Sequence, residues 1–282
     1  MPIGFSPIIT AVRWESTGAF SADSIRLHEQ GEQTSPVAVL DDFRVSGRPF
    51  GPHPHAGFSA LTYVFEDSPA RARSRDSLDN DITAEPGGIV WFQAGRGAMH
   101  HEIPADADSE LRGAQIFVKL SAQNKLISPR TFWLDAPDVP EWRNNDADRV
   151  RVAVGVFHGV ASPLVPAEPF DLLDVELQHM ITFDLPIAHQ TLVYVRTGRV
   201  RVGADGYEAL LHGRQALALR GGGQATLEAV DIARLLILSG PEQREPVVID
   251  GPFIMNDRAQ VDAAAARYGT GAMGRLAPLG ED

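Results

Sequence analysis

Two short histidine-containing stretches carry the side chains in this sequence that could bind a metal ion. His53 and His55 are separated by one proline, and His100 lies two positions before Glu102. Alternate side chains of a β-strand project from the same face, so each pair would converge on one side of a sheet if its stretch is extended. The proline biases the residue before it toward extended backbone, which favours that geometry. We therefore predict one metal site formed by these four residues, with His101 on the opposite face.

This ligand set defines the chemistry that the site could perform. Three neutral imidazoles and one carboxylate suit Fe, Mn, Co, Ni, Cu or Zn, and the ligands alone do not choose among these metals. On a six-coordinate ion, four protein ligands leave two positions open, as activation of a bound substrate or of dioxygen requires. The sequence has no cysteine, which excludes disulfides, thiolate metal sites and thiol nucleophiles. The other histidines are scattered, and we assign no function to His28, His158, His179, His189 and His212.

The elements that must position these ligands are predicted to be antiparallel β-strands. Runs rich in Val, Ile, Leu, Thr and aromatic residues recur between clusters of Gly, Pro and Asp, as at 61–65, 89–92 and 116–120. One helix is expected near the C-terminus, capped by Asn256 or Asp257. Its apolar face would consist of Val261, Ala264, Ala265 and Tyr268.

The length and a weak internal repeat predict two domains. A chain of 282 residues exceeds the usual size of one compact core. Residues 136–148 are rich in Pro, Asp and Asn, so we expect them to connect a metal-binding domain at 1–135 to a second domain at 149–282. In each half a strand ending in Tyr-Val is followed by a glycine turn and another strand, but the second half offers only His189 near the matching position. If the halves arose by duplication, the second domain has lost the ligands.

Charge and hydropathy narrow the classes of partner. The formal net charge of −12 disfavours direct binding to nucleic acid, because the protein would repel phosphates. No run reaches the roughly 18 apolar residues that a membrane-spanning helix needs, and the N-terminus lacks the basic segment of a secretion signal. A cytoplasmic protein is therefore expected.

Two other patterns are interpreted as having no functional role. Residues 269–274 match a dinucleotide-binding glycine pattern, but they follow a predicted helix instead of a strand. Arg71, Arg73 and Arg75 could attract an anionic substrate, but they lie in a polar segment with Asp and Ser, as in a solvated hairpin.

The order of several motifs resembles the pirin family of bicupins. The resemblance rests on GPHPHAGFSALTYVFED, RDSLDN, PGGIVWFQAGRGAMHHEIP and LRGAQIFVKL within residues 40–140, and on GPFIMNDRAQVDAAAARYGTGAMGRL near the C-terminus. It implies an all-β fold of two cupin-type antiparallel β-sandwich or barrel domains packed together, with a short C-terminal helix. It also implies one divalent metal ion, Fe(II) being our first expectation, held only in the N-terminal domain by His53, His55, His100 and Glu102.

The resemblance implies two classes of function. Some family members are associated with quercetin 2,3-dioxygenase activity, and others are metal-dependent regulatory partners of transcription factors. Our leading hypothesis is a dioxygenase whose substrates are dioxygen and a flavonol or related enolisable phenol, with Glu102 as catalytic base for the coordinated hydroxyl. The resemblance further implies ring opening with loss of carbon monoxide. Gln115 would orient a ligand or the substrate, or would be a structural amide.

Two alternatives stay open. One is a non-enzymatic metal- and redox-sensing protein that binds a protein partner. The other is a metal enzyme for a different small molecule, since cupins host many reactions. Ala56, Ser59 and Phe117 differ from the residues common at these positions in the family, and all three lie close to the predicted pocket.

Overall fold

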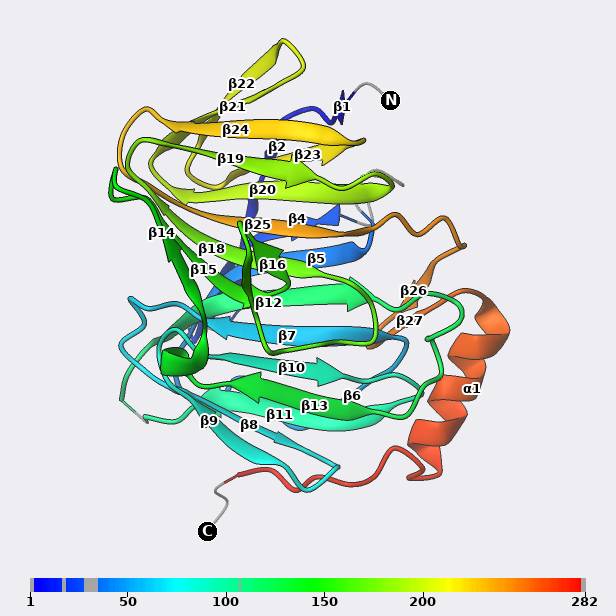
Figure 1. Cartoon of the computed structure of the whole chain (residues 1–282). Coiled ribbons are helices and arrows are strands. Elements are labelled where there is room, and N and C mark those ends of the chain that lie inside the picture. The colour runs from blue at the N-terminus through cyan, green and yellow to red at the C-terminus, as the bar shows by residue number, and fades with distance from the viewer. Residues whose placement is uncertain (1–2, 17–18, 28–34, 107, 280–282) are drawn as a thin grey trace. The chain divides into compact units, whose positions relative to one another are not determined.

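The chain folds into β-strands and one α-helix within the ranges that the structure describes, as predicted (Figure 1). The computed structural model describes residues 3–16, 19–27, 35–106 and 108–279, so His28 lies outside the described residues. Contacts divide the chain into two compact units. We call one the histidine unit, which comprises Arg13–Ser24, Val39–Pro137 and Arg244–Asp282. The other is the apolar unit, which comprises Met1–Val12, Ile25–Ala38 and Asp138–Gln243.

The two units do not follow the simple N-terminal and C-terminal division expected from the sequence. The chain passes between them inside the predicted connection 136–148, but residues 244–282 group with the histidine unit. Conversely, strand β1 (Gly4–Phe5) pairs with β23 (Gln215–Arg220) of the apolar unit. Pairing between strands so distant in sequence leaves no local pattern in composition, which is why the sequence did not indicate it.

The histidine unit contains two larger antiparallel sheets whose residues line one cavity. The seven-stranded sheet has the order β13 (Arg130–Leu134), β10 (Ile89–Gln93), β7 (Phe58–Val64), β12 (Leu111–Lys119), β5 (Val37–Val45), β4 (Phe20–Arg26) and β3 (Val12–Ser16). The four-stranded sheet has the order β6 (His53–His55), β11 (Ala98–Pro104), β8 (Ala72–Asp76) and β9 (Asp81–Ala84). All described pairings of β7 are antiparallel, as predicted.

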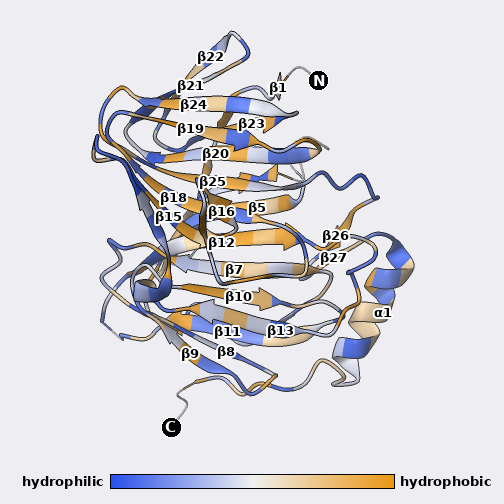
Figure 2. Ribbon diagram, in the orientation of Figure 1, coloured by the Kyte–Doolittle hydropathy of each residue, from blue (hydrophilic) through white to orange (hydrophobic). Residues whose placement is uncertain are grey.

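The apolar unit has the same plan. Its larger sheet has the order β1, β23, β20 (His189–Thr197), β25 (Ala233–Pro241), β18 (Asp171–Leu177), β15 (Arg149–Val154) and β14 (Glu141–Arg143), with β2 (Ile9–Thr10) also paired to β23. Its four-stranded sheet has the order β19 (Met180–Leu185), β24 (Gly223–Ala229), β21 (Arg199–Ala204) and β22 (Tyr207–His212). Strands β16 (Val156–Phe157) and β17 (Val160–Ala161) form a hairpin between β15 and β18 in the sequence. Figure 2 shows the apolar residues concentrated in the strands.

The strand orders of the two units match element by element, which supports the predicted internal repeat. The order β10-β7-β12-β5-β4-β3 corresponds to β23-β20-β25-β18-β15-β14, and β6-β11-β8-β9 corresponds to β19-β24-β21-β22. The counterparts of the histidine strands β6 and β11 are therefore β19 and β24. The sequence comparison of the two halves matched His189 to the position of the histidine motifs. That match was wrong, because His189 begins β20, the counterpart of β7. The counterpart strands instead contribute Ile181, Phe183, Ala225 and Leu227 to a continuous apolar core.

The last part of the chain supports the histidine strands from outside the cavity. Strands β26 (Val248–Asp250) and β27 (Phe253–Met255) form a hairpin, and Ala56 makes a parallel bridge to Phe253. Gly57 has φ +86°, and a Cβ there would lie 2.0 Å from the carbonyl oxygen of Ile254, so only glycine permits this approach. The segment that follows β6 is thus held against the C-terminal hairpin.

Helix α1 (Arg258–Gly269) follows this hairpin, close to the expected place (Figure 1). Asp257 is the N-cap, and its side chain accepts a hydrogen bond from the Gln260 amide, as one of the two predicted caps. Val261 and Ala264 are buried, but Ala265 and Tyr268 are exposed, so the buried face is narrower than predicted. The apolar cluster that it joins comprises Ala56, Met99, Phe253, Met255, Val261, Ala264 and Met273. No helix in the described ranges is long and apolar enough to cross a membrane, and the cytoplasmic location stays a prediction.

Candidate metal centre and its pocket

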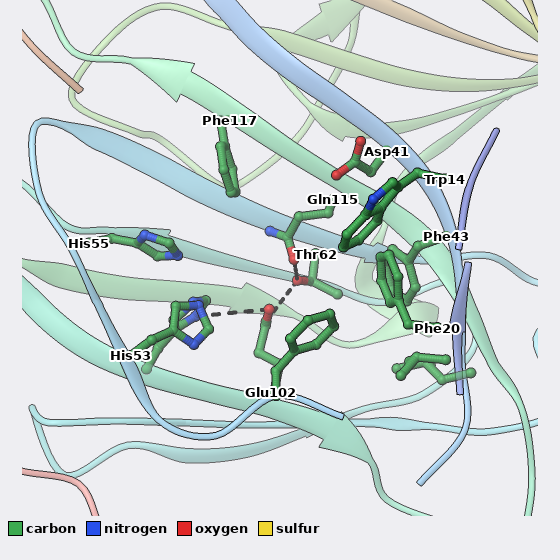
Figure 3. A pocket seen from close by; sticks show the side chains of 14 residues that line it. Trp14, Phe20, Asp41, Phe43, His53, His55, Thr62, Glu102, Gln115 and Phe117 are labelled. Atoms are coloured by element: carbon green, nitrogen blue, oxygen red, sulfur yellow. Dashed lines mark hydrogen bonds and ion pairs between the residues drawn. The ribbon is translucent and has the colours of Figure 1, made fainter. Parts of the chain in front are cut away.

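Strand pairing brings three of the predicted ligands together at the small sheet of the histidine unit. In the antiparallel pair β6–β11, His53 lies directly opposite His100. Their Nε2 atoms are 3.0 Å apart. His55 projects from the same face two residues along β6, and one ligand atom from each of the three histidines lies within 4.8 Å of the others. The predicted convergence of His53, His55 and His100 is therefore present, and Figure 3 shows His53 and His55 close together.

Backbone carbonyls orient two of these imidazoles. His53 Nδ1 is 2.9 Å from the carbonyl oxygen of Gly51, and His55 Nδ1 is 3.4 Å from that of Pro252. A carbonyl oxygen can only accept, so each Nδ1 carries the proton and each Nε2 keeps its lone pair. Both rings thus present a free electron pair to the space between the histidines.

Burial keeps all three imidazoles neutral. It lowers the pKa of His53, and it lowers the pKa of His55 to about 3, with a smaller effect from the neighbouring His53. Burial also places the pKa of His100 well below its ordinary value. The His100 ring stacks on Phe92, with centroids 4.8 Å apart and planes 7° from parallel. Neutral, fixed imidazoles are the form in which histidine binds metals, because no proton has to be displaced.

Glu102 lies beside the three histidines but outside their tight cluster. Its Oε1 accepts a hydrogen bond of 2.7 Å from the Thr62 hydroxyl, and its Oε2 is 3.9 Å from His100 Nδ1. Burial raises the pKa of this carboxyl to about 7, against smaller opposing effects of hydrogen bonds from Thr62 and Ser74. The predicted role of Glu102 as the fourth ligand stays a prediction.

The donor atoms fit a divalent transition metal. Two ligands at right angles on an ion, each about 2.1 Å from it, are about 3.0 Å apart, which is the separation of the Nε2 atoms of His53 and His100. The buried Nδ1 of His100 has no hydrogen-bond partner among the described residues. The stacking on Phe92, and not a hydrogen bond at Nδ1, therefore holds this ring in place. Without a cation, one ring donates its Nε2 proton to the other in this contact; a cation between the two atoms could instead accept a lone pair from each of them.

The histidines open into a cavity of about 220 Å³ between the two sheets of the histidine unit. Alternate residues of the large sheet form the wall that faces them. This wall includes Trp14 from β3, Phe20 from β4, Asp41, Phe43 and Val45 from β5, Leu111, Gln115 and Phe117 from β12, and Thr62 from β7. Figure 3 shows His53 and His55 at one end and Trp14, Phe20, Asp41 and Phe43 at the other. A metal ion at the histidines would thus face a largely apolar, aromatic chamber.

Gln115 is one of the polar residues of this wall. It lies directly opposite Thr62 in the pair β12–β7. Its Nε2 donates to the Leu61 carbonyl at 2.9 Å, which directs Oε1 toward the Thr62 hydroxyl, 3.2 Å away. The amide therefore borders both the cavity and the hydrogen bond to Glu102, which agrees with an orienting position.

His101 projects from the opposite face of β11, as predicted, and it is buried. Its Nε2 donates to the carbonyl oxygen of Phe50 at 3.0 Å. Phe50 lines the cavity, so His101 anchors one edge of the pocket instead of contacting a metal. Among the residues that differ from the family pattern, Phe117 lies 5.5 Å from the His55 ring, whereas Ala56 and Ser59 are buried.

The patterns interpreted as non-functional are explained by local structure. Arg71 pairs with Asp106, and Arg73 and Arg75 both lie within ion-pair distance of Asp81, so these guanidiniums are engaged by neighbouring carboxylates. The glycine pattern at 269–274 follows helix α1 instead of a strand. The four described histidines outside the two motifs, His158, His179, His189 and His212, belong to the apolar unit.

Several pocket residues had no signal in the sequence. Trp14, Phe20, Asp41 and Phe43 come from strands β3, β4 and β5, which precede the histidine motifs and carry no recognisable spacing. Only the order of strands in the large sheet brings them opposite the histidines. An alternation of side chains within β5 could have suggested that Asp41, Phe43 and Val45 share one face, but not that the face borders this cavity.

Comparisons with known proteins agree with this architecture. The Pirin family matches residues 14–118, and the Pirin C-terminal cupin domain matches residues 172–274. A Pseudomonas aeruginosa protein provisionally named a quercetin 2,3-dioxygenase is 32% identical over 256 residues, which cover 86% of this chain and 88% of that protein. The crystal structure of a quercetin 2,3-dioxygenase from Acinetobacter baumannii has a TM-score of 0.85 at 23% identity and covers 97% of this chain and 99% of its own.

A bacterial pirin from Escherichia coli, crystallised in complex with nickel(II), has a TM-score of 0.63 at 18% identity. The match covers 85% of this chain and 99% of that one. The predicted all-β bicupin fold is confirmed by these matches together with the two sets of sheets. The resemblance inferred from the histidine motifs is also confirmed: the chain belongs to the pirin family.

Proposed function

We propose that the protein is a metal-dependent dioxygenase that acts on a flavonol or a related enolisable phenolic molecule. The observation that carries the proposal is the placement of three neutral imidazoles, two of them buried and one half-buried, at the end of an aromatic cavity. Relatives named as quercetin 2,3-dioxygenases support the same reaction class. Dioxygen would be the second substrate.

The residues His53, His55, His100 and Glu102 would hold one divalent first-row metal ion. Fe(II) is our first choice, and Mn, Co, Ni, Cu and Zn suit the same ligands; the nickel(II) complex of the Escherichia coli pirin supports binding of this class of ion. When bound, the ion lowers the pKa of a coordinated hydroxyl and enables reaction with dioxygen.

Glu102 would take the proton of the substrate hydroxyl on one of its carboxylate oxygens. Its pKa of about 7 in the metal-free site suits a group that gains and loses a proton near neutral pH. The Thr62 hydroxyl, which contacts both Glu102 Oε1 and Gln115 Oε1, fixes the carboxylate against the large sheet. Thr62 and Gln115 would thereby hold the base in place while the proton moves.

The aromatic residues would bind the body of the substrate and exclude water from it. Phe117 lies next to the metal end, with its ring 4.7 Å from that of Phe58. Phe43, Phe20 and Trp14 continue the apolar surface toward the far end. Flat apolar surfaces of this kind favour a planar aromatic ligand through burial and ring contacts.

The first test combines metal analysis with a flavonol-decay assay under oxygen. The double variant His53→Ala, His55→Ala should lose both its stoichiometric metal and its turnover of quercetin, because two of the three clustered imidazoles are removed. His212→Ala is the matched control, since this exposed histidine belongs to the apolar unit, and it should retain both. Turnover by the double variant would contradict the proposal.

The second test separates metal binding from proton transfer. Glu102→Gln should retain metal through the three histidines and lose most of its turnover. Retained turnover with metal bound would reject Glu102 as the base. If the native protein holds metal but degrades no flavonol, two alternatives gain support: a non-enzymatic metal-sensing protein, or an enzyme for another small molecule. Metal-dependent pull-down of a protein partner would favour the first of these.

A further inference from the structure

The end of the cavity opposite the histidines contains a carboxylate that the proposed reaction does not use. Asp41 lies on β5 and lines the cavity together with Phe43 and Val45, its alternate neighbours on the strand. Figure 3 shows Asp41 at the end of the pocket away from His53 and His55. A carboxylate that lines the pocket can accept a hydrogen bond from a bound molecule.

The structure fixes the position of this carboxylate. The Ser24 hydroxyl on the neighbouring strand β4 donates a hydrogen bond of 2.5 Å to Asp41 Oδ1. Asp41 is half-buried, and Ser24 is buried. A positioned, partly desolvated carboxylate is a strong acceptor for a hydroxyl donor, because hydrogen bonds to charged groups are stronger than neutral ones.

The charge of the lining favours a particular class of ligand. Asp41 and Glu102 are the carboxylates of the cavity, and the described lining contains no Lys or Arg. A carboxylate- or phosphate-bearing ligand would find no cation to neutralise it, apart from the metal ion of the proposed function. A neutral ligand with hydroxyl donors would instead match the acceptors at both ends.

The surface between the two ends favours a planar aromatic body. The ring of Phe20 lies 5.3 Å from that of Trp14 and 5.0 Å from that of Phe50, both in edge-to-face contact. Phe43 is held close to β12, because Gly113 leaves room for its ring; a Cβ on Gly113 would lie 3.0 Å from Phe43 Cζ. Trp14 and Phe50 are 46% and 39% exposed, so the cavity is in contact with solvent where these two rings line it.

We propose that Asp41 binds a hydroxyl of the substrate ring farthest from the metal, so that the pocket selects polyhydroxylated aromatic molecules over those with a single metal-binding hydroxyl. This inference rests on the proposed function for the orientation of the substrate. In it the metal-binding hydroxyl lies at Glu102, the aromatic body contacts Phe43 and Phe20, and the distal hydroxyl donates to Asp41. Asp41 is thus a specificity-determining residue.

The test compares two flavonols that share the metal-binding group. Quercetin carries additional hydroxyls on its other rings, whereas 3-hydroxyflavone carries none. With metal-loaded protein, kcat/KM should favour quercetin for the native chain, and Asp41→Ala should reduce this preference about tenfold to a hundredfold, as expected for loss of a hydrogen bond to a charged group. Asp41→Asn, which keeps the size of the side chain, should reduce it by a smaller factor.

Asp42→Asn is the matched control. Asp42 is the next residue on β5, so its side chain projects from the other face and does not line the cavity. It should keep the native preference. Metal content and the thermal unfolding midpoint of each variant show whether it is folded. If Asp41→Ala does not fold, the preference of Asp41→Asn for quercetin is the deciding measurement.

An unchanged preference in a folded, metal-loaded Asp41 variant would overturn the inference while leaving the dioxygenase proposal intact. If the native protein degrades neither flavonol, the dioxygenase proposal fails, and the same pair is then compared by quenching of tryptophan fluorescence. Tighter binding of quercetin that depends on Asp41 would still support the inference, and equal binding of both molecules by the native chain and the Asp41 variants would overturn it.

Discussion

The buried carboxyl of Glu102 should make the metal-free protein lose stability as the pH rises. Its folded-state pKa is raised from 4.5 to about 7 by burial. Below 4.5 the folded and unfolded chains both carry the proton, so the residue makes no difference between them. Between 4.5 and about 7 the unfolded chain releases the proton while the folded chain keeps it, and the free energy of unfolding falls throughout this window.

The gap between these pKa values corresponds to about 3 kcal/mol as an upper limit. Glu102→Gln removes the titration but keeps an oxygen that can accept from the Thr62 hydroxyl. The variant should therefore gain stability relative to the native chain as the pH rises from 4.5 to 8, by about 1–3 kcal/mol. Below pH 6.5 His55 also lowers the free energy of unfolding, because it is protonated in the unfolded chain and stays neutral in the folded one. This effect is the same in both chains, so it cancels in the difference between their free energies of unfolding.

The measurement is urea unfolding of the two chains at several pH values after removal of metal with a chelator. A difference in unfolding free energy that does not change between pH 4.5 and 8 would refute the argument, because it would mean that the carboxyl is not desolvated. Saturation with a divalent metal should reverse the sign at pH 8, since the cation then stabilises the carboxylate that Gln lacks. Asp42→Asn again serves as a control for the removal of one negative charge, since its side chain lies on the face of β5 away from the cavity.

Three further outcomes follow from residues around the site and in the apolar unit. Phe92→Ala should lower the free energy of unfolding by about 3–5 kcal/mol and weaken metal binding about tenfold or more, because it removes the ring stacked on His100. Urea unfolding measures the first effect and calorimetric titration with metal the second. An unchanged metal affinity would contradict the role of Phe92 in orienting His100. Gly57→Ala should lower the free energy of unfolding by at least about 2 kcal/mol and reduce metal content. Gly47 also has a positive φ, +64°, but no heavy atom lies within 4 Å of the place that its Cβ would take. Gly47→Ala should therefore lower the free energy of unfolding by only about 1 kcal/mol and leave metal content intact. Glu141 has its pKa lowered to about 2, chiefly by a hydrogen bond from an arginine on β15, so its contribution is present above pH 4.5 and lost toward pH 2; in urea unfolding, Glu141→Gln should be less stable than the native chain by about 1–2 kcal/mol at pH 6 and equal to it near pH 2.

The histidine cluster could be predicted because its geometry is local. The separation of two residues within His53–His55, and again between His100 and Glu102, fixes which side chains share a face once the backbone is extended. What joins the two pairs is the register that sets His53 opposite His100. That register depends on hydrogen bonds between segments about 45 residues apart in sequence, and the resemblance to a known family supplied it where spacing could not.

The remainder of the pocket could not be predicted, because its residues are chemically ordinary. Asp41 is one of many acidic residues in the chain, and Phe43 and Trp14 read as core or strand residues. The allocation of residues 244–282 to the histidine unit was missed for a related reason. Packing of an apolar cluster around Met99 decides where that segment lies, and apolar residues in a sequence do not indicate their partners.

The bridge between Ala56 and Phe253 and the contact of His55 with Pro252 have a consequence for the order of events during synthesis. The ribosome completes β6 and β11 well before it delivers Pro252, whose carbonyl accepts a hydrogen bond from the imidazole of His55. A growing chain can pair β6 with β11 early, but the carbonyl that sets the tautomer of His55 is made about 150 residues after β11. Metal loading should therefore follow synthesis of this segment, and a protein truncated before residue 252 should fold much of its sheet structure and yet hold its metal poorly.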